Sequence, residues 1–316
     1  MFKIAYIYRD RPALMDPLSE ILTLMRPTVY GFRGLDAAGD WAFAFAAAEG
    51  IRCFAIEYGG CWLRVVGGTP AIRLEAGDVV LLTGARDVHL FSCETIEPVD
   101  SMAFLSTVSA GQVATINGGG ECRGIGGFFG LRGSDVATLL IAVPPIVHVR
   151  SDVSRAALYA GVQRLMRELS EPRPGGALLA SHLAQALLVE AMRAHLEAGT
   201  TSQGWLAALS VPAMRRVLSA IHSDVVRRWT LRDLAEVACM SRSTFAAHFE
   251  RITGDTPIAY LTRWRMILAA DRLATSDLSL TAVAASVGYD SESAFGNAFK
   301  RVMKSTPHQY RSLANQ

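Results

Sequence analysis

Two short segments near the carboxyl end of this 316-residue chain carry side chains suited to reading the edges of DNA bases. Asparagine can form hydrogen bonds with adenine, and glutamate can accept a hydrogen bond from cytosine. Arginine or lysine at a helix end more often binds phosphate. The candidates in the first segment are Arg242, Ser243, Ala246, Ala247 and Arg251. Those in the second are Ser291, Glu292, Ser293, Asn297, Lys300 and Arg301. The alternative interpretation is an ordinary solvated helix face.

A second set of reactive or aromatic residues lies in the first half of the chain. Cys53, Trp62 and His89 are the candidates for lining a small-molecule pocket. The five cysteines are an odd number without Cys-x-x-Cys spacing, so reduced thiols are expected. A thiol switch formed by Cys93 and Cys122 is an open alternative, although isolated cysteines in strands are usually buried as small hydrophobic residues.

A duplicated pattern predicts the elements that position the DNA-reading candidates. The first copy contains Leu231, then Phe245-x-x-x-Phe249, then Thr256-Pro257-x-x-Tyr260. The second contains Leu280, then Phe295-x-x-x-Phe299, then Thr306-Pro307-x-x-Tyr310. The two copies are offset by 49 residues at the start and by 50 from the phenylalanines on. Each copy predicts a helix, a short turn and a second helix, which is the helix-turn-helix pattern.

Helical spacing predicts which face of each second helix is exposed. Phenylalanines four residues apart share one face of a helix, so each pair should point into a core and leave the candidates outward. Thr230 to Asp233 resembles a capping box at the start of the first unit. Between the units, residues 257–273 predict one long helix that can hold both units rigidly, with the two recognition helices in successive major grooves.

Charge is distributed unevenly along the chain. The formal net charge is only +2, but residues 201–316 hold 14 Lys and Arg against nine Asp and Glu. The first 200 residues carry a slight acidic excess. A basic carboxyl part favours DNA as a partner, with a scattered surface imbalance as the alternative.

The remaining sequence predicts an α+β protein of several domains. Residues 1–150 show short apolar runs between glycine-rich turns, typical of a β-barrel or jelly roll. Residues 151–204 predict two antiparallel helices that form a dimer interface or an interdomain brace, or else cover the barrel. Residues 205–316 are expected to be all helical. We expect residues 1–14 to be an extension or a misplaced start, because Met15 directly precedes Asp16.

These residues carry a family resemblance. The segments around Met240-Ser-Arg-Ser-Thr-Phe245 and Val287-Gly-Tyr-x-Ser-Glu-Ser-Ala-Phe295 resemble the two halves of the AraC/XylS-type transcription-regulator domain. The resemblance implies that each protomer reads two adjacent major grooves near a promoter. One departure concerns Ala247 and His248, where many relatives with this segment carry arginines. This departure puts the affinity or base preference of the first recognition helix in question, but not its fold.

The first half is similar to the cupin-like sensor domain of one AraC subgroup, through Gly59-Gly-Cys-Trp-Leu-Arg64 and Leu74-Glu-Ala-Gly-Asp-Val79. Gly77-Asp78 followed by His89 is similar to the second cupin motif. The first cupin motif would need His-x-His, and the corresponding strand, residues 51–56, has no histidine. Because a cupin metal takes three or four converging ligands, we expect no metal and no other cofactor. A metal-dependent cupin enzyme is therefore the disfavoured alternative, and no catalytic residue is expected.

Together these patterns predict a cytoplasmic DNA-binding transcription regulator, more specifically an activator, that senses a small molecule. The expected partners are double-stranded promoter DNA, an unknown small-molecule effector, RNA polymerase and a second copy of the chain in a homodimer. No apolar run approaches the 18 residues of a membrane span, and the amino end is too polar for a signal peptide.

Overall fold

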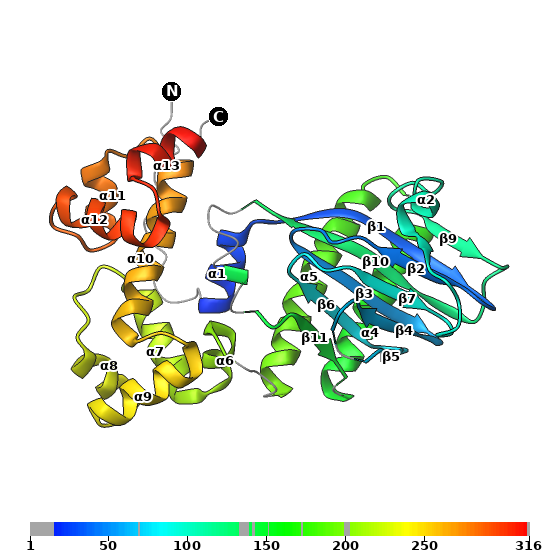
Figure 1. Ribbon diagram of the computed structural model, residues 1–316, viewed down its shortest axis with the longest axis horizontal. Helices are drawn as coiled ribbons and strands as arrows, with labels where there is room; N and C mark the ends of the chain where they lie inside the picture. Colours follow the sequence, from blue (N-terminus) through cyan, green and yellow to red (C-terminus); the bar gives the residue numbers. More distant parts are fainter. Residues whose placement is uncertain are drawn as a thin grey trace. The chain divides into compact units, whose positions relative to one another are not determined.

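The computed structural model describes residues 16–314, except residues 69, 133–138, 141–142, 151, 172 and 199–202. The expectation about residues 1–14 therefore falls outside the described residues. The chain folds into two compact units (Figure 1). The sheet unit comprises Pro27–Leu131 and Pro144–Thr200. The helical unit comprises Met1–Arg26, Arg132–Val143 and Thr201–Gln316, as far as these are described.

Two β-sheets form the frame of the sheet unit. The six-stranded sheet has the order β11 (Ile146–Val149), β6 (Val79–Thr83), β3 (Ile51–Tyr58), β10 (Cys122–Leu131), β1 (Pro27–Ala37) and β9 (Val113–Ile116). The five-stranded sheet has the order β5 (Ile72–Glu75), β4 (Gly60–Val65), β7 (Val88–Phe91), β2 (Ala42–Phe45) and β8 (Val99–Asp100). No ladder joins the two sheets among the described strands. The α+β class is confirmed, but the predicted barrel is an open pair of sheets.

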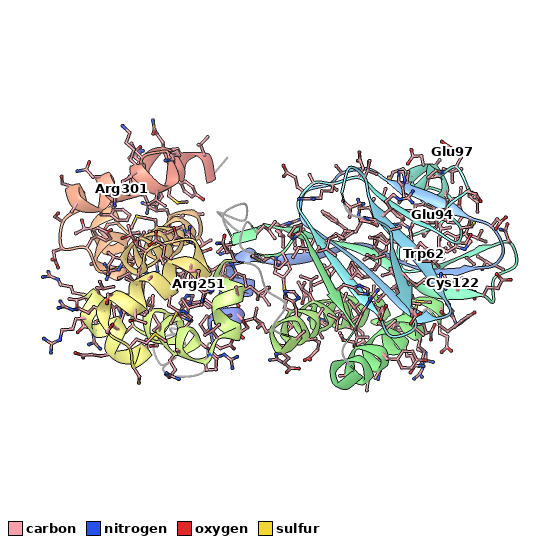
Figure 2. All side chains as sticks on the ribbon, turned by 60° about the horizontal axis from the view of Figure 1, so that its bottom comes forward. Trp62, Glu94, Glu97, Cys122, Arg251 and Arg301 are labelled. Carbon is pink, nitrogen blue, oxygen red and sulfur yellow. The ribbon has the colours of Figure 1, made fainter. Side chains whose placement is uncertain are left out.

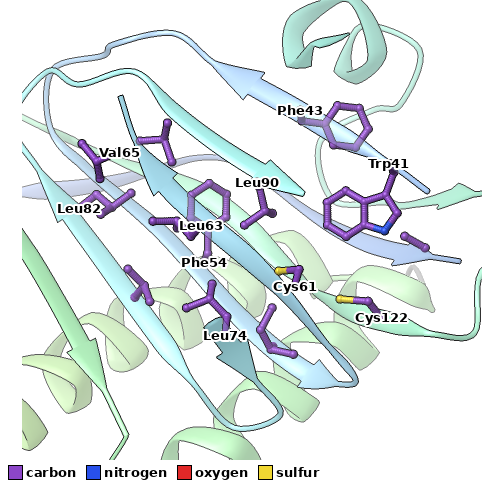
Figure 3. Close-up of a cluster of buried hydrophobic side chains, with 14 residues drawn as sticks. Trp41, Phe43, Phe54, Cys61, Leu63, Val65, Leu74, Leu82, Leu90 and Cys122 are labelled. Carbon is purple, nitrogen blue, oxygen red and sulfur yellow. The ribbon is translucent and has the colours of Figure 1, made fainter. Parts of the chain in front are cut away.

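The two sheets pack through side chains that alternate along each strand. On β3, Phe54 and Ile56 join the cluster between the sheets, together with Leu63 of β4 and Leu90 of β7 (Figure 3). This cluster is continuous across both sheets, and fully burying one such side chain contributes roughly 1.5–3 kcal/mol relative to exposure. Period-two alternation therefore decides which residues reach the space between the sheets.

Two helices cover the other face of the six-stranded sheet. Helix α4 (Asp152–Ser170) contacts β1, β3 and β10, and helix α5 (Gly176–Ala198) contacts β1, β6 and β11. The helices also pack against one another, and a side chain at Gly161 would come within 2.8 Å of Leu187. Covering the sheet was one of the predicted roles of these helices, while a role in dimerisation stays a prediction.

The helical unit contains the duplicated segment and, in addition, the first described helix of the chain. Its described helices are α1 (Pro17–Met25), α6 (Trp205–Ser210), α7 (Pro212–Ser223), α8 (Leu231–Ala238), α9 (Arg242–Thr253), α10 (Pro257–Thr275), α11 (Leu280–Ser286), α12 (Glu292–Met303) and α13 (Pro307–Ala314). The indole N–H of Trp205 also donates to the carbonyl of Leu139 at 3.1 Å. Segments from three parts of the chain thus build this unit. The predicted domain boundaries stay a prediction, because compactness alone does not assign function to a segment.

Removing one buried ring should destabilise the helical unit. Phe249 is fully buried on α9, so Phe249→Ala should lower the free energy of unfolding by roughly 3–5 kcal/mol through the cavity it leaves. Urea denaturation followed by circular dichroism measures this loss. Glu250→Ala, an exposed neighbour on the same helix, is the matched control and should change stability by less than about 0.5 kcal/mol. Equal stability of the two variants would contradict the assigned core.

Candidate nucleic-acid interface and effector cavity

The first helix-turn-helix is built by α8 and α9. Thr230 and Asp233 form a reciprocal capping box at the start of α8, as predicted. The hydroxyl of Ser241 accepts the backbone N–H of Thr244 at 3.3 Å, which caps α9. Cys239 adopts a left-handed conformation that ends α8 and turns the chain toward α9. These caps satisfy helix-end groups locally, so the turn is set by a few adjacent residues.

A phenylalanine pair fixes how α9 is rotated. Phe245 and Phe249 are fully buried, with ring centroids 5.6 Å apart, and Phe249 meets Tyr260 of α10 edge to face at 5.7 Å. The opposite face is the predicted one: Arg242, Ser243, Ala247 and Arg251 are exposed and Ala246 is half-buried. Exposed methyl groups leave this face with few polar groups for base readout.

The second unit repeats this arrangement with α11 and α12. Phe295 and Phe299 are fully buried with centroids 5.6 Å apart, and Phe299 meets Tyr310 at 5.6 Å. Ser291 caps α12 by accepting the backbone N–H of Ala294 at 3.3 Å. Every candidate on this face is exposed: Ser291, Glu292, Ser293, Asn297, Lys300 and Arg301. Arg251 of α9 and Arg301 of α12 are labelled in Figure 2.

Two of the candidates on α12 already have partners within the chain. The hydroxyl of Ser291 is used by the helix cap, and the carboxylate of Glu292 accepts the hydroxyl of Thr281 on α11. Both interactions place these side chains at the start of α12. Asn297, in contrast, lies in the middle of the exposed face, and its side chain makes no hydrogen bond to any described residue. It is the strongest candidate there for reading a base.

Helix α10 joins the two helix-turn-helix motifs through half-buried arginines. The guanidinium of Arg265 donates to the carbonyls of Val225 at 2.9 Å and Arg227 at 2.8 Å. That of Arg272 donates to the carbonyl of Ser286 at the end of α11, at 2.7 Å. Burial lowers the pKa of both guanidinium groups, which nevertheless stay charged at neutral pH. These bonds tie segments flanking each helix-turn-helix to one connecting helix.

An arrangement that sequence reasoning missed links α1 to the same core. Imidazole Nδ1 of His222 lies 2.7 Å from a carboxylate oxygen of Glu20, and its Nε2 lies 2.9 Å from the hydroxyl of Tyr260. The ring stacks on Trp264 with centroids 4.1 Å apart. Arg26, the left-handed residue that ends α1, donates to Asp271 of α10 at 2.7 Å. Contacts over about 200 residues of sequence leave no local signal to detect.

The sheet unit encloses a cavity of about 400 Å³ between its two sheets. Cavities of this size hold small organic molecules. The lining is mostly apolar and comes from both sheets and from α2 (Ser101–Leu105). Among the lining residues are Phe43, Phe54, Leu90, Phe104, Ile125 and Phe128. Sequence reasoning had not assigned these residues to a pocket, although alternation along β3 would have identified Phe54.

The three predicted pocket residues do not line this cavity. Residues 52, 54 and 56 of β3 face the cavity, so Cys53 points to the opposite side of the sheet and is fully buried there. On β4 the lining residue is Cys61, so Trp62 points away, and Arg73 lies over its ring at 5.5 Å. On β7 it is Leu90, which turns His89 outward. Each predicted residue is the direct neighbour of a residue that lines the cavity. Neighbouring residues of a strand point to opposite faces of the sheet, so each predicted side chain points away from the cavity.

Two arginines break the apolar lining. The guanidinium of Arg52 donates to the carbonyl of Ala46 at 2.7 Å, and that of Arg33 donates to the carbonyl of Val108 at 2.9 Å. Neither has an ion pair among the described residues. Burial lowers the pKa of Arg52, although nearby Asp87 opposes this shift. The cavity therefore combines apolar walls with two positive charges that lack a carboxylate in direct contact.

The cysteines fall into distinct environments. Cys93 is exposed, with its sulfur 3.2 Å from the hydroxyl of Thr95. Cys122 is buried in the same cluster as Cys61, a neighbour that the prediction of a Cys93–Cys122 switch had not considered. Burial raises the pKa of Cys53 to about 12, so this thiol stays protonated.

The described residues contain no cluster of three His, Cys, Asp or Glu side chains arranged to hold a metal ion. His148, rather than His89, contacts the buried Asp78 of the Gly-Asp turn, with Nε2 and Oδ2 3.1 Å apart. Within the described part of the chain, no helix is both long and apolar enough to cross a membrane.

Two tandem helix-turn-helix units attached to a sheet-rich unit define a DNA-binding transcription regulator with an additional domain. A family described as Cupin matches residues 16–197, and one described as a helix-turn-helix domain matches residues 234–312. The chain belongs to the AraC-like transcription regulators.

Two relatives that match over almost the whole chain agree with this assignment. A putative AraC-like transcription regulator of Streptomyces lividans is 39% identical over 94% of this chain and 98% of its own length. The HTH-type transcriptional regulator AlkR of Acinetobacter baylyi is 30% identical over 94% of this chain and 99% of its own. The crystal structure of the DNA-binding domain of AdpA in complex with a target DNA is 33% identical, covering 31% of this chain and 87% of that one, with a TM-score of 0.30.

Proposed function

We propose that this regulator reads promoter DNA with α9 and α12 in successive major grooves, and that a small molecule in the sheet-unit cavity controls it. The observation that carries the first part is the repeated phenylalanine pair, which turns the same face of both helices outward. On that face, Arg242, Arg251, Lys300 and Arg301 grip phosphate, while Ser243, Ser293 and Asn297 contact bases. Ala246 and Ala247 offer only methyl contacts, suited to thymine.

The remaining parts of the proposal follow from this role. A DNA-reading regulator acts where the chromosome lies, so we place the protein in the cytoplasm, where it activates transcription by contacting RNA polymerase. The relatives are named as regulators, and the cavity is apolar where an enzyme would gather acid–base groups, so we propose sensing rather than catalysis. Effector binding favours one of two states of the protein to the extent that it binds that state more tightly.

Asn297→Ala should weaken binding to the operator by about 1–3 kcal/mol, which is roughly 5- to 150-fold, because one base contact is lost. An operator selected from random duplexes and titrated by fluorescence anisotropy measures this change. Affinity for random DNA should stay the same, and all binding should fall steeply with salt. Ser312→Ala, exposed on α13, is the control. An unaltered ratio of operator to random affinity in Asn297→Ala would show that Asn297 reads no base.

We further propose that the effector has an apolar body and a negatively charged head. The apolar lining suits the body, and Arg52 and Arg33 provide the only guanidinium groups among the lining residues. Both guanidinium groups are half-buried and have no carboxylate in direct contact, so a ligand carboxylate would be stabilised there. The guanidinium of Arg52 donates to the carbonyls of Phe45 and Ala46. The charged head of the effector would accept hydrogen bonds from its remaining N–H groups in place of water.

Dodecanoate and dodecanol, which share one chain length, test this proposal by isothermal titration calorimetry. We expect dodecanoate to bind more tightly, and Arg52→Leu to weaken dodecanoate by about 1.5–3 kcal/mol, or roughly 10- to 150-fold, while dodecanol changes little. Arg86→Leu, an exposed arginine outside the cavity lining, is the matched control. Equal binding of the two probes, or equal loss for both in Arg52→Leu, would contradict the charged head.

We also propose a homodimer that uses the free surface of α4 and α5. Leu178 and Leu179 of α5 are exposed apolar residues, and Leu178 is 66% accessible. Sedimentation velocity should show a dimer that Leu178→Glu converts to monomer, because a charge would be buried at the contact. Val226→Glu, an exposed apolar residue of the helical unit, should leave the dimer intact. A wild-type monomer at micromolar concentration would refute this part.

A further inference from the structure

Two cysteines from different sheets lie at the wall of the cavity. Cys61 comes from β4 of the five-stranded sheet and Cys122 from β10 of the six-stranded sheet, and both line the cavity. Figure 3 labels both within the buried cluster. Both side chains belong to the same buried cluster, where each thiol affects the pKa of the other. Cys61 is fully buried and Cys122 is 4% accessible, so neither is open to bulk solvent except through the cavity.

The backbone keeps these two residues together. Gly59, in the turn between β3 and β4, has a φ of +70°, and a side chain there would come within 1.9 Å of the carbonyl of Glu121. It would also approach the α-carbon of Cys122 to 3.0 Å. The turn that leads into Cys61 is therefore packed directly on the start of β10. This packing brings the backbone next to Cys61 close to the backbone of Cys122.

The surroundings make the two thiols unequal. The thiol of Cys61, the guanidinium of Arg73 and the backbone N–H of Gly60 all stabilise the Cys122 thiolate and lower its pKa, against the opposing effect of burial. The pKa of Cys61 is raised well above its usual value, because of the neighbouring Cys122 thiol and because Cys61 is buried. Thiolates are the nucleophiles, so Cys122 is suited to attack and Cys61 to act second.

We propose that Cys61 and Cys122 form a reversible disulfide when a small peroxide enters the cavity, so that this pair is an oxidation site of the sensor domain. The cross-link would join the two sheets at the cavity wall. This proposal does not depend on whether the cavity also binds an apolar effector.

The reaction balances with one peroxide. The Cys122 thiolate attacks one oxygen of hydrogen peroxide, so that an S–O bond forms, the O–O bond breaks and hydroxide leaves. Hydroxide takes the proton of Cys61 and becomes water. The Cys61 thiolate then attacks the sulfenic sulfur of Cys122, forming the S–S bond and breaking the S–O bond, and the departing hydroxide takes the proton first lost by Cys122. Two thiols lose two electrons and one peroxide becomes two waters.

The other cysteines serve as internal controls. Cys53 points to the opposite face of β3 and is fully buried. Cys93 and Cys239 are exposed and face bulk solvent. An oxidant that acts by simple accessibility would modify Cys93 and Cys239 first, whereas the proposed mechanism selects the buried pair.

The test treats full-length wild-type protein with graded hydrogen peroxide, blocks free thiols with N-ethylmaleimide and maps the peptides without reduction. We expect a peptide joined through Cys61 and Cys122, 2 Da lighter than its reduced parts, which dithiothreitol reverses. It should form at lower peroxide than any modification of Cys93. In Cys61→Ser, checked for folding by circular dichroism, Cys122 should stop at a sulfenic acid that dimedone traps. Cys93→Ser should behave as wild type.

Two results would overturn the proposal. One is a Cys61 and Cys122 pair that stays alkylatable while Cys93 is oxidised. The other is a disulfide that joins Cys122 to Cys93 or to a second chain. Because the mapping uses wild-type protein, a variant that fails to fold does not block it. DNA binding and dodecanoate titration of the same sample show separately whether the proposed regulatory function holds.

Discussion

The buried phenylalanine pair of each recognition helix is the constraint on which the DNA-reading surface depends. Phe245 with Phe249, and Phe295 with Phe299, fix the rotation of α9 and α12 because turning either helix would expose two rings. Edge-to-face contacts with Tyr260 and Tyr310 anchor both pairs to the helices that follow. Once the rotation is set, the outward side chains are determined. Burial of the phenylalanines therefore exposes the same face of both helices, and the two faces differ only in their side chains.

The sheet unit uses alternation along strands for a different purpose. Its two sheets present apolar residues inward, yet leave a cavity of about 400 Å³ where native packing would normally close. Phe54, Leu90 and Phe104 give most of its wall an apolar surface, while Arg33 and Arg52 add charge. A cavity in a core lowers the free energy of unfolding. A binding role for a ligand would account for this cost.

Continuous backbone links the two units. Helix α1 belongs to the helical unit through Glu20 and His222, and only Arg26 separates it from β1 of the sheet unit. Strand β1 contributes Gly31, Arg33 and Leu35 to the cavity lining. The chain passes between the two units four times, at residues 26, 131, 143 and 200. A ligand that shifts β1 would therefore act on a strand continuous with a helix packed on the DNA-reading core.

The sequence by itself determined the family, the α+β class, the tandem helix-turn-helix and the outward faces of α9 and α12. These follow from local rules, since caps, helical spacing and a repeat all act within one or two turns of helix. Only the tertiary structure decided the rest. Cys53, Trp62 and His89 each lie one residue away from a cavity-lining position, because strand register depends on pairing with distant strands. The contact of Glu20 with His222 and that of Cys61 with Cys122 join residues far apart in the chain, and no local pattern records which distant segments will meet.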